Sequence, residues 1–387
     1  MNSIELFAGA GGLALGLVNS GFQHKAIVEV NKDACKTIRN NNVFDYGKKL
    51  YEGNIINFDY TTIENEIDLI SGGPPCQPFS LGGKSQANND SRDMFPQAVN
   101  AIREKKPKAF IFENVKGLMR KSFEPYFKYI ILQLQYPSIE RSTNESWEQH
   151  HAALEKYHAQ SAHTGLEYNV TYKLVNAADY GVPQKRERVF FIGFRTDIHI
   201  NWTFPEPTHS EDALIWEKWI SKDYWKQHQL LVPTIDEKTL KKVEKIKKKY
   251  GSSKPQYLPW VTVRDAICNL PDPQKAHAKN FNQHIFKGGA KIYPGHTGSY
   301  IDDPSKALKA GTHGVPGGEN MIRYEDGSVR YLTVRESARI QTFPDNFQFE
   351  GSWSEVMRQL GNAVPAKLAE KIGLSIFNAL IEIKGLT

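Results

Sequence analysis

The chain has few cysteines and no long apolar run, and each absence excludes a class of protein. Its 387 residues include only three cysteines, Cys35, Cys76 and Cys268, with no Cys-x-x-Cys spacing. So sparse and odd a set argues against a disulfide framework or a zinc knuckle, and a reducing cytoplasm is the expected location. No run of roughly 18 apolar residues occurs, so we expect no membrane-spanning helix. The N-terminus has no basic residue before Lys25 and is therefore not expected to be a signal peptide.

The excess of one sign of charge over the other is also small. The chain has 49 Lys and Arg residues against 43 Asp and Glu residues, a net charge of +6. This excess permits a nucleic-acid partner without requiring one. Hydrophobic residues make up 40% and charged residues 24%, which excludes collagen, coiled coil and general disorder. At about 150 residues per domain, the length allows two domains, or one with an insertion.

Short apolar runs alternate with helical patterns in the first third of the chain. Strands are predicted at Ser3–Ala8, Lys25–Val30, Ile67–Ser71 and Ala109–Phe112. Helices are predicted at Leu13–Val18 and Lys32–Asn40. This alternation predicts an α/β fold of βαβ units with a parallel sheet covered on both faces. Two later segments, Tyr168–Val175 and Val189–Phe194, are expected to continue the sheet.

Two segments break this pattern. Pro137–Gly165 is polar and contains four histidines, His150, His151, His158 and His163. A solvated insertion is the favoured interpretation, with a metal site as the alternative, so we predict no metal. The second segment, 205–330, is rich in Trp, Lys, Pro and Gly and loses the βα alternation, which predicts a separate, smaller domain.

A basic helix is predicted inside the second segment. Apolar residues recur at helical spacing, namely Leu240, Val243, Ile246 and Tyr250. Seven lysines lie between Lys238 and Lys249 on the remaining faces. We favour an amphipathic surface helix, and a phosphate-facing helix is the alternative.

A glycine-rich turn follows the first predicted strand, in the sequence Glu5-Leu-Phe-Ala-Gly9-Ala-Gly11-Gly12-Leu-Ala-Leu-Gly16. Glycines permit a tight turn and let a ligand approach the N-terminus of the next helix. Glu29 ends the second predicted strand, 18 residues after Gly11, where a carboxylate can accept both hydroxyls of a ribose. The pattern predicts an adenosine-type cofactor, either a nicotinamide or a methyl donor. A purely structural turn is the alternative.

Reactive side chains follow two further strands. In Ser71-Gly-Gly-Pro-Pro75-Cys76-Gln-Pro-Phe-Ser80 the prolines hold an extended loop. This puts Cys76 at the C-terminal end of a strand, where α/β folds bind ligands. The other two cysteines are interpreted as buried small hydrophobic residues. Glu113 ends the Ala109–Phe112 strand as a partly desolvated acid, with a helix-capping Glu-Asn pair as the alternative.

Three long polar side chains precede the strand Val189–Phe194. By a period of two, Gln184, Arg186 and Arg188 share one side of the entering strand. Three donors on one side favour an anionic ligand or the edge of a base. A solvent-facing strand end is the alternative.

Six motifs resemble, in order along the chain, those of the bacterial-type DNA (cytosine-5)-methyltransferase family. They are Phe7-Ala-Gly-Ala-Gly-Gly, Gly73-Pro-Pro-Cys-Gln-Pro-Phe-Ser, Glu113-Asn-Val, Gln184-Lys-Arg-Glu-Arg, Leu332-Thr-Val-Arg-Glu-Ser-Ala-Arg-Ile-Gln-Thr-Phe-Pro-Asp and Gln359-Leu-Gly-Asn-Ala-Val-Pro. The resemblance covers both ends of the chain. It implies a Rossmann-like domain dependent on S-adenosylmethionine, with a smaller, irregular target-recognition domain.

The resemblance also implies a mechanism. The Cys76 thiolate would attack carbon 6 of cytosine, Glu113 would protonate or hydrogen-bond ring nitrogen 3, and Arg188 would hold the exocyclic oxygen. Arg186 would brace the loop or a phosphate. Carbon 5 would then take the methyl group, and loss of its proton would expel the cysteine. The base must leave the duplex for this chemistry, and the loop with Ser80 and Arg92 would close on it.

The cofactor residues are likewise those that the resemblance implies. The set comprises Phe7, Gly9, Gly11, Leu13, Glu29, Val30, Asn54, Ile55, Pro75, Asn362 and Val364. Glu29 would bind the ribose and Val30 would lie against the adenine. Two positions depart from the family pattern. Asn54 replaces the usual Asp and can still accept from the adenine amino group. Ala307-Leu308 stands where the family often has Thr-Leu or Thr-Val.

The expected organisation follows from these motifs. A catalytic domain is predicted at 1–204 and is completed by 356–387, the target-recognition domain lies at 205–330, and 331–355 connects them. The sequence Ala310-Gly-Thr-His-Gly-Val-Pro-Gly-Gly-Glu-Asn320 is the best candidate for a recognition loop, with an ordinary surface turn as the alternative. The predicted DNA-contacting residues are Ser80, Arg92, Gln184, Thr312, His313, Asn320 and Arg323.

The expected partner is double-stranded DNA. We expect a monomer that acts alone or with a restriction endonuclease without forming a stable complex. A tRNA cytosine-5 methyltransferase is one alternative, although the long 205–330 segment favours DNA. A catalytically silent DNA-binding relative is the other, although it would be expected to have lost Cys76, Glu113 or the arginines.

Overall fold

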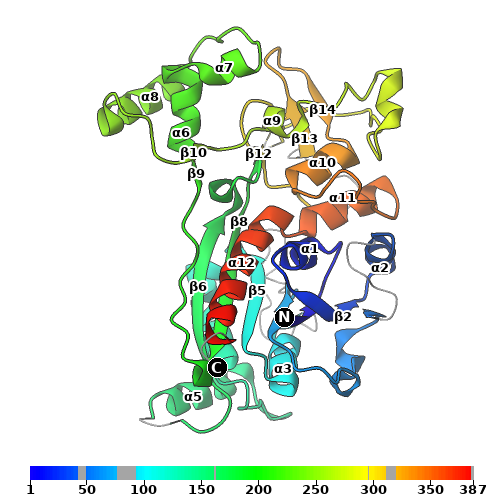
Figure 1. Cartoon of the computed structure of the whole chain (residues 1–387), viewed down its shortest axis with the longest axis vertical. Coiled ribbons are helices and arrows are strands. Elements are labelled where there is room, and N and C mark those ends of the chain that lie inside the picture. Colours follow the sequence, from blue (N-terminus) through cyan, green and yellow to red (C-terminus); the bar gives the residue numbers. More distant parts are fainter. Residues whose placement is uncertain (42–48, 76–92, 161–162, 295, 311–319, 385–387) are drawn as a thin grey trace. The chain divides into compact units, whose positions relative to one another are not determined.

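The computed structural model describes residues 1–41, 49–75, 93–160, 163–294, 296–310 and 320–384, which form two compact units (Figure 1). Unit 1 comprises Met1–Val175, Glu187–Pro205 and Phe347–Thr387, and unit 2 comprises Asn176–Arg186 and Glu206–Asn346. The sequence-based division places a boundary after residue 204, and the units divide after Pro205. The short segment Asn176–Arg186 instead groups with unit 2, and the connecting segment 331–355 is divided between the units after Asn346.

Unit 1 is built on a seven-stranded sheet in the order β3-β2-β1-β4-β5-β8-β6. The strands are β1 (Asn2–Leu6), β2 (Gln23–Glu29), β3 (Leu50–Glu52), β4 (Leu69–Gly72), β5 (Ala109–Val115), β6 (Tyr168–Asn176) and β8 (Glu187–Arg195). The strands from β3 to β5 pair in parallel, whereas β8 pairs with β5 antiparallel. The predicted α/β class is therefore confirmed, but the sheet is mixed at the β8 side.

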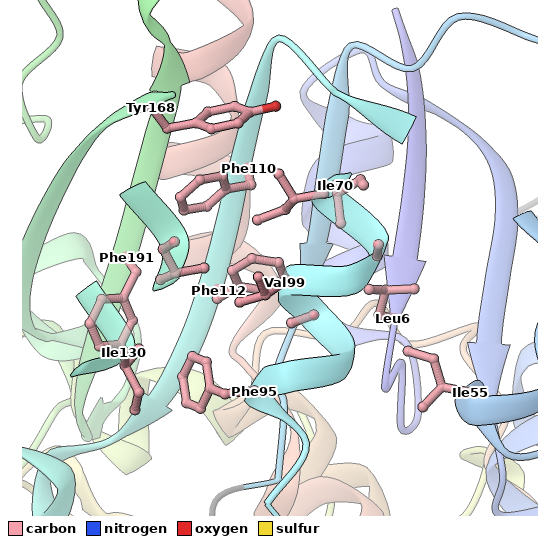
Figure 2. Close-up of a cluster of buried hydrophobic side chains, with 14 of the residues drawn as sticks. Leu6, Ile55, Ile70, Phe95, Val99, Phe110, Phe112, Ile130, Tyr168 and Phe191 are labelled. Carbon is pink, nitrogen blue, oxygen red and sulfur yellow. The ribbon is translucent and has the colours of Figure 1, made fainter. Parts of the chain in front are cut away.

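Helices flank the sheet. They are α1 (Gly12–Asn19), α2 (Lys32–Arg39), α3 (Phe95–Lys105), α4 (Glu124–Gln135), α5 (Trp147–His158), α11 (Trp353–Asn362) and α12 (Ala366–Lys384). Their starts follow local chemistry, since Asn31 caps α2 by accepting from the Ala34 N–H at 2.8 Å. The core lies between α3, α4 and the sheet, and Figure 2 shows Phe95 and Val99 of α3 close to Phe112 of β5.

The polar segment after α4 is folded onto unit 1. Its helix α5 packs against α4, with Leu154 and His150 buried. His150 Nδ1 lies 2.9 Å from the Tyr129 hydroxyl, and its Nε2 lies 3.2 Å from the Ile139 carbonyl oxygen. The interpretation of four solvated histidines is therefore wrong for His150, because tyrosines of α4 provide partners that a local sequence pattern cannot reveal. Among the described His, Cys, Asp and Glu side chains, no three gather in a way that could hold a metal ion.

Apart from one helix of 14 residues, unit 2 is built of short elements. Its helices are α6 (Glu211–Ile215), α7 (Asp223–Gln227), α8 (Glu237–Tyr250), α9 (Val263–Ile267) and α10 (Val334–Ile340). Its strands are β7 (Gln184–Lys185), β9 (His209–Ser210), β10 (Leu258–Pro259), β11 (Ser299–Tyr300), β12 (Ser305–Lys306), β13 (Met321–Arg323) and β14 (Val329–Tyr331). The predicted surface helix is confirmed as α8, with Val243 and Ile246 buried. Within the described ranges, every helix is too short or too polar to cross a membrane.

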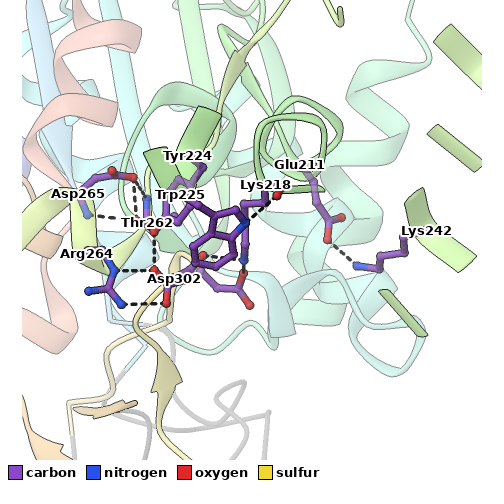
Figure 3. A network of polar contacts seen from close by, with 10 residues as sticks. Glu211, Lys218, Tyr224, Trp225, Lys242, Thr262, Arg264, Asp265 and Asp302 are labelled. Carbon is purple, nitrogen blue, oxygen red and sulfur yellow. Dashed lines mark hydrogen bonds and ion pairs between the residues drawn. The ribbon is translucent and has the colours of Figure 1, made fainter. Parts of the chain in front are cut away.

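A buried polar network holds unit 2 together (Figure 3). Asp302 accepts two hydrogen bonds from Arg264, at 2.6 and 3.0 Å, and a third from the Tyr224 hydroxyl at 2.7 Å. Burial by itself would raise the pKa of Asp302, but the bonds from Arg264 and Tyr224 outweigh it and lower the pKa. The network is thus a fully bonded carboxylate that ties α7 and α9 to the loop before β12.

Candidate active site

The turn between β1 and α1 has the backbone that the glycine motif predicts. Phe7, Gly9 and Gly11 all have positive φ, at 54°, 54° and 83°, and the Gly11 N–H donates to the Ala8 carbonyl at 2.9 Å. A side-chain carbon at Gly9 would meet nothing within 4 Å, so the turn leaves open space there. Leu13 lies in the first turn of α1, where backbone N–H groups lack partners inside the helix.

Glu29 lies beside this turn. One carboxylate oxygen accepts from the Gly9 N–H at 2.7 Å, and the other accepts from the N–H groups of Val30 and Asn31 at 2.9 and 2.7 Å. The Glu29 carbonyl also accepts from the Gly53 N–H at 2.9 Å. The predicted ribose acceptor is therefore a nearly buried, fixed carboxylate between the glycine turn and the end of β3.

Apolar side chains near Glu29 are unusually exposed. Val30 is 65% exposed and Ile56 is 59% exposed, although both are aliphatic. Ile55 instead packs into the core, so its side chain is turned away from solvent. The Asn54 side chain is exposed, and its oxygen accepts from the Ile56 N–H at 3.0 Å. Val30 and Asn54 are thus accessible to a ligand, and Ile55 could meet one only through its backbone.

The C-terminal motif lies between α11 and α12. Asn362 ends α11 and is exposed, whereas Val364 is buried. Helix α12 packs along α1, as Figure 1 shows, and a methyl group at Gly16 would overlap Ala369 and lie 2.6 Å from the Glu370 backbone nitrogen. The chain therefore returns to the helix that starts at the glycine turn.

The loop that leads to Cys76 is fixed at both ends. The Asn114 side-chain amide donates to the Pro74 carbonyl at 2.9 Å, and the Pro75 carbonyl accepts from the Met94 N–H at 3.0 Å. A side-chain carbon at Gly73 would lie 3.4 Å from a carboxylate oxygen of Glu113. The chain just before Cys76 thus passes beside Glu113. Cys76, Ser80 and Arg92 lie outside the described residues.

The other two cysteines differ from each other. Cys35 is buried, as predicted, and burial raises the pKa of its thiol to about 12, which makes it a poor nucleophile. Cys268 is exposed, so its interpretation as a buried residue is wrong. It follows the last turn of the short helix α9, at the surface of unit 2.

Glu113 and Arg188 come together at the end of the sheet. Because β5 and β8 pair antiparallel with Val115 opposite Arg188, the arginine reaches diagonally to Glu113. Its Nε lies 2.8 Å from Glu113 Oε1. That oxygen is buried, and its contact with Arg188 is an ion pair rather than a well-aligned hydrogen bond. The pair is therefore shielded from solvent.

Gln184 and Arg186 lie inside unit 2 and are fully buried. The side-chain oxygen of Gln184 accepts from the Leu308 N–H at 2.9 Å, and Arg186 Nη1 donates to the Leu308 carbonyl at 3.2 Å. Burial alternates along the segment, since Lys185 and Glu187 are exposed, in agreement with the predicted period of two. Both side chains hold backbone, so the structure gives no support to the predicted DNA contact of Gln184.

Only some of the predicted recognition residues belong to the part of the chain that the structure describes. Thr312 and His313 lie outside them. Asn320 is fully buried, and its amide bonds both the N–H and the carbonyl of Lys309, each at 3.1 Å. This side chain is committed to the backbone and is not presented to a base. Arg323 is half-buried on β13, with its guanidinium carbon 5.3 Å from the centre of the Tyr300 ring.

Sequence reasoning missed two polar residues near the glycine and cysteine motifs. Asn114 appeared only as part of a possible cap, yet its position directly after the acid at a strand end was the available signal. Glu5 is buried on the central strand β1, with the Ser71 hydroxyl donating to its carboxyl group, and burial raises the pKa of Glu5 to about 8. A lone acid in an apolar strand was the signal in this case.

Comparisons with known proteins agree with these features. A family model described as C-5 cytosine-specific DNA methylase matches residues 1–136 and 148–378. The chain is 34% identical over 379 residues to the Type II methyltransferase M.PspPI of Psychrobacter sp. (strain TA137), covering 97% of this chain and 79% of that one. It is 32% identical to the Type II methyltransferase M.NgoMIV of Neisseria gonorrhoeae, covering 98% and 97%.

A solved structure shows the same fold. The Entamoeba histolytica methyltransferase EhMeth superposes with a TM-score of 0.55 at 17% identity, over 98% of each chain. At this identity the likeness concerns the fold alone. It agrees with the mixed α/β sheet described above.

Proposed function

Since the chain belongs to the C-5 cytosine-specific DNA methylase family, we propose that it transfers a methyl group from S-adenosylmethionine to carbon 5 of cytosine in a short duplex sequence. The target cytosine is flipped out of the duplex, because the side chains that attack its ring and bond its edge cannot reach a base that is stacked inside the helix. The observation that carries the proposal is the buried Glu113–Arg188 pair beside the chain that enters Cys76.

The residues of the β1–α1 turn fit the cofactor. The open space at Gly9 and the fixed carboxylate of Glu29 suit the sugar of an adenosine, and the exposed Val30 suits its base. Phe7, Gly11 and Leu13 would complete this side, together with Asn54, the Ile55 backbone, Pro75, Asn362 and Val364. When bound, S-adenosylmethionine supplies the methyl group.

The chain's own residues carry the remaining chemistry. Cys76 adds as a thiolate to carbon 6 of cytosine, which makes carbon 5 nucleophilic. Glu113 holds a proton at ring nitrogen 3, and Arg188, whose Nε lies 2.8 Å from the Glu113 carboxylate, donates to the exocyclic oxygen. Loss of the proton from carbon 5 then breaks the bond to Cys76. Low exposure of the ion pair keeps water away from the base and strengthens these contacts.

Unit 2 would read the DNA sequence. Thr312, His313 and Arg323 remain the proposed base contacts, with Ser80 and Arg92 on the loop of Cys76. Arg323 stacked on Tyr300 is the one of these that the structure describes. Asn320, Gln184 and Arg186 are assigned instead to holding the backbone of Leu308 and Lys309, just before the proposed loop.

The relatives at 34% and 32% identity are Type II methyltransferases, and this supports a role in restriction and modification. We propose that the enzyme acts as a monomer and protects DNA from an endonuclease with which it forms no stable complex. Location in the cytoplasm, where the DNA of a bacterium lies, belongs to the same proposal.

Bisulfite sequencing of a plasmid propagated with the gene tests this function. One cytosine in every occurrence of one short sequence should resist conversion by bisulfite. Cys76→Ser should abolish this resistance while the protein still binds DNA. Wild-type protein should also be trapped covalently on duplexes with 5-fluorocytosine, since fluorine does not leave as a proton does. Full conversion of every cytosine by bisulfite, with methylation of tRNA instead, would contradict the proposal.

A further inference from the structure

Helix α8 holds most of the net charge of the protein. Glu237–Tyr250 contains seven lysines and two glutamates, an excess of five positive charges, whereas the whole chain has an excess of six. Exposed lysines are ordinary on a helix, but such a concentration within fourteen residues is not balanced by acids on the same helix. The surroundings of these lysines therefore decide what the charge can bind.

Six of the seven lysines of α8 fall into two groups, and Lys247 belongs to neither. Lys242 and Lys249 bind acids of α6, since Lys242 lies 2.6 Å from Glu211 and Lys249 lies 2.7 Å from Asp212. Figure 3 shows Lys242 extended towards Glu211. Together with the burial of Val243 and Ile246 against α6 and the turn after it, these pairs fix the rotation of α8.

The second group faces away from this anchored side. At 100° per residue, positions spaced i, i+3, i+7 and i+10 lie along one strip of a helix. The strip opposite Val243 and Ile246 consists of Lys238, Lys241, Lys245 and Lys248. All four are exposed. Lys241 pairs with Glu237 on its own helix, and Lys238 interacts electrostatically with Asp236, whereas Lys245 and Lys248 have no acidic partner within 4 Å among the residues that the structure describes. We call these four residues the lysine strip.

We infer that the lysine strip binds the phosphate backbone of duplex DNA. The strip is about 15 Å long, since a helix rises about 1.5 Å per residue. One DNA strand carries a phosphate about every 3.4 Å, so four or so phosphates lie within that length. Contacts to phosphate carry no sequence information directly. The strip therefore adds affinity without sequence preference.

This inference rests on the proposed function, because duplex DNA is the partner only if the protein is a DNA methyltransferase. The two can still fail separately. Methylation of a plasmid tests the function, whereas the strip is tested by equilibrium binding. A protein that methylates DNA and has an inert lysine strip would overturn this inference alone.

The test uses the full chain and a fluorescent duplex that contains the methylated site. Lys238→Gln, Lys245→Gln and Lys248→Gln are combined in one variant, and affinity is measured between about 50 and 200 mM salt. We expect the slope of log affinity against log salt to become shallower by about 2 to 3, close to one for each phosphate that is no longer neutralised. The methylated sequence and kcat should not change, and KM for DNA should rise.

Two controls separate local contact from total charge. Replacing Lys36, Lys128 and Lys156 of unit 1 by Gln removes the same number of exposed charges and should leave the slope near the wild-type value. The combined substitution of the three strip lysines by Arg should also preserve it, since the charge remains. An unchanged slope in the Gln variant, or an equal reduction in the unit 1 control, would overturn the assignment.

Discussion

Asn114 connects the two strand ends on which the proposed chemistry depends. Its amide group donates to the Pro74 carbonyl at 2.9 Å, two residues before Cys76, and its oxygen accepts from the Val115 N–H at 2.8 Å. Both bonds are at least partly buried, so neither is readily replaced by water. Asn114 therefore positions the approach to Cys76 against Glu113 without touching the base.

We expect Asn114→Ala to lower kcat by about 10- to 100-fold, because an unsatisfied buried carbonyl costs roughly 1–3 kcal/mol. Asn114→Asp is the matched variant, since a carboxylate keeps the shape but cannot donate to Pro74. Steady-state kinetics and binding of S-adenosylmethionine should be measured on both. The positioning role predicts a lower kcat with unchanged cofactor affinity in both variants. An Asp variant as active as the wild type would contradict it.

Glu29 illustrates how a ligand-binding residue also supports its own loop. Its carboxylate accepts from three backbone N–H groups, those of Gly9, Val30 and Asn31. Glu29→Ala should weaken binding of S-adenosylmethionine about tenfold or more, since bonds to a charged acceptor are worth roughly 1.5–3 kcal/mol. It should also lower Tm, whereas Glu29→Gln should affect Tm less. Calorimetric titration and thermal unfolding give both quantities, and an unaltered cofactor affinity would place the ribose elsewhere.

Glu5 predicts a pH dependence of stability. Burial raises its pKa to about 8, against 4.5 for an ordinary glutamate, although the bond from Ser71 opposes the shift. Between these pH values the folded state holds a proton that the unfolded state has released. Stability should therefore fall as pH rises from 4.5 to about 8.

Glu5→Gln should remove this decline, because the amide is neutral at every pH and can still accept from Ser71. The gain at pH 8 is expected to be on the order of a few kcal/mol, since each pKa unit corresponds to about 1.4 kcal/mol. Urea unfolding at several pH values measures it. A variant with the same pH slope as the wild type would show that Glu5 is ionised in the folded protein.

At the scale of elements, the contact between α1 and α12 depends on a small residue. A methyl group at Gly16 would overlap Ala369 and approach the Glu370 backbone, neither of which can move as a flexible side chain does. Gly16→Val should therefore separate the helices and lower both Tm and affinity for S-adenosylmethionine, since α1 begins at the glycine turn. Overpacking of this kind costs typically about 1–3 kcal/mol or somewhat more. Gly288→Val, at a position where an added side-chain carbon would meet only the Phe286 ring at 3.7 Å, serves as a control for substitution of a glycine.

Elements with strongly apolar sequences were predicted closely. The strand at Ala109–Phe112 has side chains buried on both faces, and the structure extends it only to Val115. By contrast, β3 has three half-exposed or exposed residues, Leu50–Glu52, which give no apolar run to detect. The direction of β8 also escaped prediction, because an apolar run is the same whether its strand is parallel or antiparallel.

The sequence identified which polar residues matter, but it did not always predict what each of them binds. The period of two correctly grouped Gln184 with Arg186, yet a period cannot say what the shared side faces, and both side chains bond Leu308. Asn320 was chosen because it can bond a base edge, and the same two amide atoms bond Lys309 instead. Partners distant in sequence decide between these uses, and a single sequence does not contain them.

For the whole molecule, the division into units follows the proposed division of labour. Glu113 and Arg188 belong to unit 1, whereas Arg323 and the lysine strip belong to unit 2. The boundary falls between Arg186 and Glu187, inside one motif. Within unit 2, Gln184 and Arg186 bond the main chain of Leu308, and Gln184 also donates to the side chain of Gln341 at 2.9 Å. A donor sequence with another residue at position 308 can therefore be held in the same way if it keeps a glutamine at position 341.

This backbone grip makes an exchange of Glu206–Asn346 for the matching segment of a relative feasible. The hybrid should methylate the relative's sequence at an undiminished rate, because Cys76, Glu113, Arg188 and the cofactor residues are retained. Specificity should follow the exchanged segment, since good base contacts contribute roughly 1–3 kcal/mol of discrimination each and only a few are needed. Bisulfite sequencing identifies the new site, and binding of S-adenosylmethionine verifies that unit 1 is intact. A hybrid that binds the cofactor and still methylates the original sequence would locate recognition in unit 1 and refute the assignment.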